Sequence, residues 1–397
     1  LVICINRSFC DQIRNTPMLR YWTSGESHGK TMLAMVDGFP SGVKVNDDQI
    51  NFDLKLRQGG YGRGKRQQLE TDQVEFLSGT WQGTTLGSPI AMQVINRDYK
   101  LERLKELERP RPGHGDLTGA VKYLGSIRGV LERASARESC VRVAAGSLAK
   151  QMLSHFGIRV IGYVVQLGGI DLPLESANDF DSMLDQRTQS AIYSLCPSKD
   201  PEVISLIDQT AEDGDTLGGI VETKVTGLPF GLGTHAQWDK KLDGKLAQAV
   251  MAVQAIKGVE IGLGFQSAAL PGSKVHDPIQ YDSTATQEPN LGFIRPSNNA
   301  GGLEAGMTNG QPLVVRAAKK PIATLRKPLE SINLATKEKH TANYERSDVC
   351  AVSACSIIIE NVIAFEIAAA FVEKFGGDSV LEMKKRFELF NEMARKR

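Results

Sequence analysis

Hydrophobic positions along this chain of 397 residues fall into short runs that glycine clusters separate. Brief apolar runs bounded by turn residues are typical of β-strands. They predict strands over Met32–Val36, Val74–Leu77, Ile90–Ile95, Val160–Leu167, Ile220–Val225, Val259–Gly262 and Leu313–Ala317.

Longer segments place apolar or small residues three and four positions apart, which indicates helices with one buried face. Helices are predicted over Asp47–Arg57, Glu138–Phe156, Asp200–Asp213, Asp239–Gln254 and Asp348–Phe375. Asn46 or Asp47 is placed to cap the first helix, and Gly157 ends the second. Strands and helices alternate, but several strands follow one another too closely for a helical crossover. The pattern therefore favours an α+β fold over a doubly wound parallel sheet.

The chain shows no repeat, no run of like charges and no Ser/Pro-rich linker. We therefore predict one domain over residues 18–397. Residues 1–17 lack strand or helix periodicity and the features of a signal peptide, and Met18 resembles a natural start. We expect this segment to be an extension outside the fold.

The composition is that of a soluble globular protein, with 41% hydrophobic and 23% charged residues. A net charge of +1 provides no global field for nucleic acid or a membrane. The six cysteines form no CxxC pair, which indicates reduced thiols in a cytoplasmic protein. Charged residues interrupt the most apolar segment, 349–375, so we expect a buried helix there and no membrane span.

Arginine is concentrated in one part of the chain, since residues 57–142 hold 11 of the 23 arginines. Arg57, Arg63 and Arg111 lie in Gly- or Pro-rich loops with few acids, where planar guanidinium groups suit phosphate or carboxylate. Other arginines of the region lie beside glutamates and are equally consistent with a solvated surface of weak ion pairs.

Two histidines, His28 and His114, lie in glycine-flanked polar turns, where an imidazole can act as an acid or base. A capping or surface role is the open alternative. No Cys/His cluster has zinc spacing, so no metal site is predicted. The glycine-rich stretches 258–264 and 299–310 could hold a phosphate through backbone N–H groups, or simply form tight turns.

The residues alone indicate a site for a small molecule with several negative charges, together with loops for a phosphate-bearing cofactor. A non-catalytic anion- or RNA-binding protein is the alternative. The near-zero net charge and the 25 aromatic residues argue against it, because single-strand binders need a basic face and stacking aromatics.

Eight segments, in order, resemble the chorismate synthase family. They are Thr23–Gly29, Arg57–Arg66, Arg109–Leu117, Glu132–Ser139, Ala255–Gly262, Gly301–Gly310, Lys320–Leu325 and Glu345–Val352. The resemblance implies a lyase that converts 5-enolpyruvylshikimate 3-phosphate to chorismate and phosphate by an anti-1,4-elimination, the last common step of aromatic amino acid biosynthesis. It also implies reduced FMN as cofactor, NADPH as a candidate reductant, a β-α-α-β sandwich with long helices between two antiparallel sheets, a cytoplasmic location and a homotetramer.

The resemblance also assigns roles to residues at matching positions. It makes His28 the proton donor to the leaving phosphate, places His114 beside the flavin, and lets Asp348 act through Ser27 on a flavin proton. The implied cofactor contacts are Arg57, Arg63, Arg133, Ala134, Ser135, Gln254, Ala255, Ala305, Lys320, Pro321, Ile322, Ala323, Thr324 and Arg346, where Arg57 and Arg63 are assigned to NADPH or substrate. The implied substrate contacts are Arg66, Arg111 and Arg137.

Three features depart from the family pattern. Ala305 stands where the family has a glycine, and Gln254 stands where an asparagine is common. The segment between the strand at Ile90–Ile95 and His114 is also shorter than in many members. An alanine keeps the backbone N–H but restricts the backbone angles, so Ala305 is the departure that bears most on flavin binding.

Overall fold

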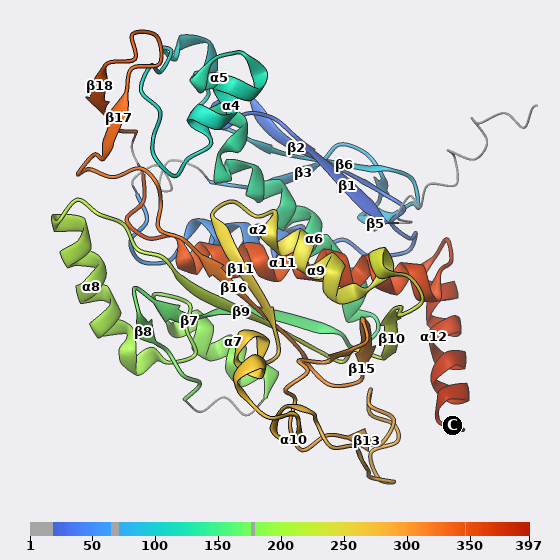
Figure 1. The fold of residues 1–397 in the computed structure, drawn as a ribbon. Helices are drawn as coiled ribbons and strands as arrows, with labels where there is room; N and C mark the ends of the chain where they lie inside the picture. The colour runs from blue at the N-terminus through green and yellow to red at the C-terminus, as the bar shows by residue number, and fades with distance from the viewer. Residues whose placement is uncertain (1–18, 65–70, 176–178, 346) are drawn as a thin grey trace, which may run out of the picture.

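The computed structural model describes residues 19–64, 71–175, 179–345 and 347–397 (Figure 1). The predicted extension 1–17 and two predicted site residues, Arg66 and Arg346, lie outside these residues.

A four-stranded antiparallel sheet forms the first layer, in the order β1-β2-β6-β3. Its strands are β1 (Arg20–Ser24), β2 (Thr31–Asp37), β6 (Ile90–Ile95) and β3 (Val74–Phe76). Alternate residues of β2, such as Ala34 and Val36, are buried, whereas Met35 between them is exposed. This period of two marks one face of the sheet as its core face.

A five-stranded antiparallel sheet forms another layer, in the order β11-β16-β9-β7-β8. Its strands are β11 (Ile256–Ile261), β16 (Leu313–Lys319), β9 (Gly219–Thr226), β7 (Arg159–Leu167) and β8 (Ile170–Asp171).

Two long helices, α6 (Ser139–Ser154) and α11 (Val352–Phe375), pack against each other beside these sheets (Figure 1). Helix α6 contacts β2 of the first sheet, and α11 contacts β7 and β9 of the second. The shorter helices α2 (Asp47–Gln58) and α9 (Leu242–Met251) pack against the same pair. The apolar helix faces and the inner sheet faces thus form one continuous core.

Among the described residues, α11 is a helix whose length and composition would allow it to cross a membrane. However, 89% of its most apolar 18-residue window is buried inside the protein. That burial agrees with the core helix that the sequence predicts.

A buried ion network links the central helices. Lys150 on α6 pairs with Asp53 of α2 and Glu360 of α11, and Glu360 also pairs with Arg187. Burial opposes the charge on Lys150, but the two carboxylates outweigh it and raise the lysine pKa. The four charges balance, which is the condition under which ions are tolerated inside a protein.

The remaining elements are short or peripheral. The helices are α4 (Asp116–Tyr123), α5 (Ile127–Ala134), α7 (Phe180–Gln189), α8 (Asp200–Glu212), α10 (Gly272–Val275) and α12 (Val380–Ala394). The strands are β4 (Thr80–Trp81), β5 (Thr84–Thr85), β10 (Phe230–Gly233), β12 (Gln280–Tyr281), β13 (Phe293–Ile294), β14 (Leu303–Glu304), β15 (Met307–Asn309), β17 (Glu330–Ile332) and β18 (Lys339–Thr341).

The structure confirms the α+β class and contains every strand and helix that the sequence predicts. Asn46 caps α2 by accepting from the Gln49 N–H, as expected. Two predicted helices begin later than expected. The residues before α9 form a 3₁₀ turn and an extended Lys241, and α11 starts at Val352 instead of Asp348.

Candidate active site

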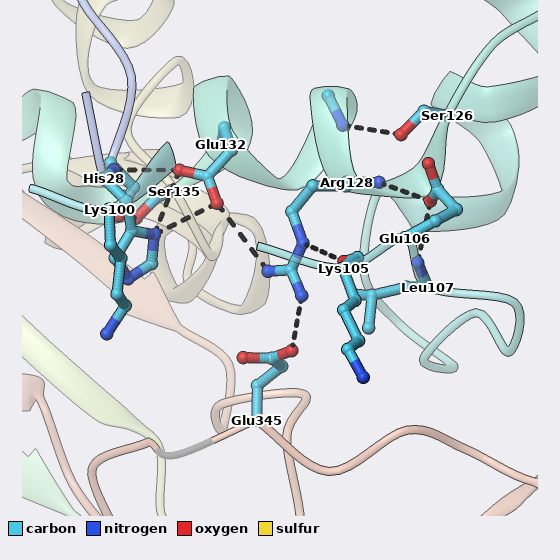
Figure 2. A network of polar contacts seen from close by, with 12 residues as sticks. His28, Lys100, Lys105, Glu106, Leu107, Ser126, Arg128, Glu132, Ser135 and Glu345 are labelled. Atoms are coloured by element: carbon cyan, nitrogen blue, oxygen red, sulfur yellow. Dashed lines mark hydrogen bonds and ion pairs between the residues drawn. The ribbon is translucent and has the colours of Figure 1, made fainter. Parts of the chain in front are cut away.

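His28 lies in the turn between β1 and β2, where the C-terminal end of α5 holds it (Figure 2). Its backbone N–H donates to Glu132 Oε2 at 2.8 Å, and its Nδ1 lies 3.0 Å from both carboxylate oxygens of Glu132. Its Nε2 lies 3.9 Å from Asp98 Oδ2, and that carboxylate pairs with Lys100. The turn fixes the imidazole on its Nδ1 side.

Ser27 is buried and hydrogen-bonds to the same C-terminal end of α5. Its backbone N–H donates to the Glu132 carbonyl oxygen at 2.9 Å, and its Oγ accepts from Ser135 Oγ at 3.1 Å. The structure therefore brings the predicted catalytic Ser27 and His28 together with Ser135, one of the predicted flavin residues.

Asp348 lies just before α11 and binds the glycine-rich loop that follows α2. Its Oδ1 accepts from the Gly64 N–H at 2.7 Å, and its Oδ2 pairs with Arg63 Nη1 at 2.7 Å. The predicted anion-binding Arg63 is therefore held by the predicted catalytic carboxylate, with both side chains largely buried.

His114 lies just before α4 and shares a carboxylate with Arg111. Asp116 Oδ1 lies 2.6 Å from His114 Nδ1, and Arg111 Nε donates to Asp116 Oδ2 at 2.8 Å. Arg111 Nη1 also donates to Thr324 Oγ1 at 2.9 Å. Burial opposes ionisation of Asp116, but the hydrogen bonds from His114 and Arg111 outweigh it and hold the pKa well below its usual range.

Two predicted cofactor loops and the turn that carries His114 meet at Lys320. Its backbone N–H donates to the Ala255 carbonyl at 3.0 Å, and its Nζ donates to the Gly113 carbonyl beside His114. Ala255 itself adopts a left-handed backbone with φ 68°. The contacts bring the loops 112–114, 254–255 and 320–324 side by side.

Glu138 connects two further cofactor segments. Its carboxylate accepts from Gln254 Nε2 at 3.1 Å and from Thr23 Oγ1 at 2.7 Å. Arg133 donates to the same threonine, through Nη2 to its hydroxyl and to its carbonyl oxygen. The other amide atom, Gln254 Oε1, is buried without a hydrogen-bond partner. It is an acceptor that a bound donor can satisfy.

Arg57 and Arg137 lie in the interior of the protein, at 4% and 7% exposure. Both donate to Asp72, at 3.2 Å and 2.6 Å. Arg57 also donates to Ser139 Oγ and to the Ala136 carbonyl, so its three nitrogen atoms bind protein groups. In this structure Arg57 supports the turn that carries Arg137.

Ala305 and the predicted cofactor residues Gln254 and Ala255 lie at opposite ends of α9. Ala305 occupies the turn between β14 and β15, and the carbonyl of the next residue, Gly306, accepts from the N–H of Leu242 at the start of α9. Gln254 and Ala255 follow the other end of α9, and ten helical residues span about 15 Å. Ala305 takes the left-handed conformation, with φ 51°, which a glycine would adopt with less strain.

The sequence analysis missed the acids that organise the site: Glu132, Asp116, Glu138 and Asp72. Each one binds a predicted histidine, arginine or glutamine. Asp116 was detectable, because it follows His114 by two residues at the start of a helix, where acids are favoured. Among the described residues, no group of three or more His, Cys, Asp or Glu side chains could hold a metal ion.

A cavity of about 790 Å³ lies away from these groups, at the N-terminal end of α2. It is lined by residues 44–49, Gln151, Ser154 and His155, and it includes none of the predicted site residues.

Comparison with known proteins gives a consistent result. The chorismate synthase family model matches residues 19–372. A chorismate synthase from Geobacter metallireducens is 50% identical over 385 residues, covering 94% of this chain and 98% of that protein. One from Enterococcus faecalis is 45% identical over 392 residues, covering 94% and 100%. A crystal structure of chorismate synthase superposes with a TM-score of 0.79 at 39% identity, covering 96% of this chain and 99% of that one.

Proposed function

The chain belongs to the chorismate synthase family, and we propose that it eliminates phosphate from 5-enolpyruvylshikimate 3-phosphate to give chorismate at the site described above. The observation that carries the proposal is the clustering of His28, Ser27 and Ser135 at the end of α5, in a fold shared with a chorismate synthase.

Substrate binding is assigned to the arginines. The substrate carries two carboxylates and a phosphate, and guanidinium groups bind such anions through paired hydrogen bonds. Arg63 and Arg111 are each held by one carboxylate, and Arg66 completes the proposed set. Arg137, anchored by Asp72 and Asn96, supplies positive charge behind the His28 turn, because Asn96 also donates to the Gly29 carbonyl.

Reduced FMN fits the three loops that meet at Lys320. The side chain of Lys320 offers positive charge for a phosphate, and Gln254 Oε1 offers a buried acceptor for a polar ring atom. We propose that residues 133–135, 254–255 and 320–324, with Arg346, hold the cofactor. When bound, reduced FMN supplies the electron density that loss of an allylic phosphate and of a non-acidic hydrogen requires.

The protein's own residues donate and hold protons and stabilise charge. His28 donates a proton to the departing phosphate oxygen, which converts a poor leaving group into a better one. His114, kept in place by Asp116, opposes the negative charge of a reduced ring. Asp348 and Ser27 are the further groups that would hold a proton for the cofactor, and Arg63 keeps Asp348 oriented.

We further propose a single domain over residues 18–397, the β-α-α-β sandwich of the family, a cytoplasmic location and a homotetramer. The outer face of the first sheet supports the tetramer. Trp22 and Met35, paired neighbours on that face, are each 49% exposed, and Ile95 farther along β6 is 57% exposed. Large exposed apolar side chains of this kind are typical of subunit contacts.

The test is anaerobic turnover of 5-enolpyruvylshikimate 3-phosphate with photoreduced FMN, followed by chorismate absorbance and released phosphate. We expect equal amounts of the two products. Flavin binding without products would contradict the assigned reaction. Salt-sensitive RNA binding without flavin binding would favour the non-catalytic alternative. Repeating the assay aerobically with NADPH and oxidised FMN tests whether the protein reduces its own cofactor. Products in that assay would support the assignment of Arg57 or Arg63 to NADPH.

A further inference from the structure

Glu132 joins the last turn of α5 to the turn that carries His28. The residue is 2% exposed. Its carboxylate accepts from the His28 backbone N–H and faces His28 Nδ1 through both oxygens, while its own carbonyl accepts from the Ser27 N–H (Figure 2). One residue therefore fixes the backbone of two neighbouring residues and the ring of one of them.

The guanidinium group of Arg128 helps to keep the Glu132 carboxylate ionised. Arg128, one helical turn earlier, lies 3.7 Å from Glu132 Oε1 and is itself anchored by Glu345 at 3.0 Å and by the Lys105 carbonyl (Figure 2). Burial acts to raise the Glu132 pKa, but the hydrogen bonds with His28 and the charge on Arg128 outweigh it, so the pKa is lowered.

An ionised carboxylate can only accept hydrogen bonds. His28 Nδ1, 3.0 Å from both Glu132 oxygens, must therefore carry a hydrogen in the neutral ring as well as in the charged ring. The exchangeable proton is then the one on Nε2. Among the described residues, Asp98 Oδ2 lies 3.9 Å from this nitrogen, and Lys100 pairs with that carboxylate.

We propose that Glu132 is a positioning residue that fixes the tautomer of His28, so that the proton given to the leaving phosphate comes from Nε2. The inference rests on the proposed function. In this step the Nε2–H bond breaks and an O–H bond forms on the phosphate, while the electron pair of the C–O bond leaves with the phosphate. The electron pair of the C–H bond broken in the same 1,4-elimination completes the new ring double bond. The ring becomes neutral with its hydrogen on Nδ1, and Nε2 is reprotonated from solvent.

The tautomer can be measured without turnover, by NMR of protein labelled with ¹⁵N-histidine. The His28→Ala variant identifies the His28 signals among the six histidines. At a pH where the ring is neutral, the wild type should show a protonated Nδ1 and an unprotonated Nε2. A neutral ring protonated on Nε2 in the wild type would overturn the proposal, whether or not the protein forms chorismate.

Glu132→Gln tests the consequence. The glutamine oxygen can accept from the His28 backbone N–H, which turns the amide NH₂ toward Nδ1 and favours the opposite tautomer. We expect the NMR signature to reverse and kcat to fall about 100-fold with KM within about twofold. The control is Glu388→Gln, the same change at a glutamate of α12 that is 60% exposed, and it should keep both the tautomer and kcat.

A fall in kcat without a change in tautomer would assign Glu132 a merely structural role and overturn the proposal. A reversed tautomer with unchanged kcat would overturn it as well. If the wild type forms no chorismate but carries hydrogen on Nδ1, the proposed function fails while the Glu132–His28 pair stands.

Discussion

Asp116 is the single carboxylate on which the His114 side of the site depends. We expect Asp116→Asn to lower the free energy of unfolding by about 3 kcal/mol at pH 7, because Arg111 then stays buried without its counter-ion. The Asp116 pKa is depressed in the fold, so its stabilisation is complete above the unfolded pKa of about 3.9 and is lost as pH falls further. Urea unfolding of variant and wild type from pH 3 to 8 measures this difference.

The Asp116→Asn difference should be largest near neutrality and shrink below about pH 4. Asp239→Asn, at an exposed position, is the control and should change stability by less than about 0.5 kcal/mol at any pH. A difference that does not vary with pH would show that the loss comes from packing and not from the charge.

The pKa of Glu366 on α11 is shifted upward, in the opposite direction from that of Asp116. Burial raises the Glu366 pKa to about 7, against the opposing influence of Lys245 and Arg142. Its ionisation therefore costs folding free energy as pH rises through the interval between the unfolded value, about 4.3, and about 7.

We expect Glu366→Gln to match the wild type near pH 4 and to exceed its stability by up to about 3 kcal/mol above pH 7. Unfolding curves at pH 4.5 and 8 measure the gain. Glu373→Gln, on the same helix but 44% exposed, should give no such pH-dependent gain. Equal stability of Glu366→Gln and wild type at pH 8 would contradict a buried, ionising carboxyl.

At the scale of elements, the contact between α6 and α11 depends on Gly146. A Cβ at this position would lie 2.1 Å from the Asn361 carbonyl oxygen of α11, closer than real Cβ contacts. We expect Gly146→Ala to cost about 3 kcal/mol, since one helix must shift away from the other. Chemical denaturation provides the measurement.

The matched control is Gly129→Ala on α5, where nothing lies within 4 Å of an added Cβ. There the substitution should stabilise by about 0.5–1 kcal/mol, because alanine favours the helix and restricts the unfolded chain. Similar effects at both glycines would mean that helix propensity, and not close packing, decides the outcome at Gly146.

The elements that the sequence predicts correctly are those with strong local patterns, such as β6, which matches at both ends. Strand β1 was missed because its five residues show no clean alternation, and α4 and α5 are only eight residues each. The starts of α9 and α11 were predicted too early, because the backbone before each helix is not α-helical and is set by distant contacts such as that of Asp348 with Gly64.

The site residues also fall into those that local sequence predicts and those that it does not. His28, His114 and the loop arginines were predicted from their local setting. Glu132 was not, since its partner lies 104 residues away, and neither was Asp72, which lies 65 residues from Arg137. Long-range pairing leaves no local periodicity in a single sequence. The separation of Ala305 from Ala255 by the length of α9 likewise follows only from the three-dimensional arrangement.

At the scale of the molecule, the outer face of the first sheet offers a test of the proposed tetramer. Antiparallel sheets commonly keep one face polar toward solvent, but here Trp22 and Met35 are paired neighbours on that face. We expect Met35→Glu to reduce the solution mass to that of a smaller assembly, as measured by light scattering, with an unchanged circular dichroism spectrum.

Met35→Leu preserves an apolar side chain and should preserve the assembly. An unchanged mass in the glutamate variant would place the subunit contact on another face. Loss of the circular dichroism signal in that variant would mean that Met35 supports the fold itself.

The central position of α11 has a consequence for how the protein is made. This helix contacts α6, β7 and β9, yet it is synthesised last but one among the helices. Helix α6 ends at Ser154 and α11 begins at Val352, so roughly 200 residues must be added before the two can meet. At about 5–20 residues per second, the ribosome needs about 10–40 s for that stretch. During this interval α6 can already pack against α2 and β2, but the surface that will contact α11 stays uncovered. Chaperones bind apolar surface that is exposed during synthesis, so we expect this nascent chain to be a chaperone client until α11 emerges.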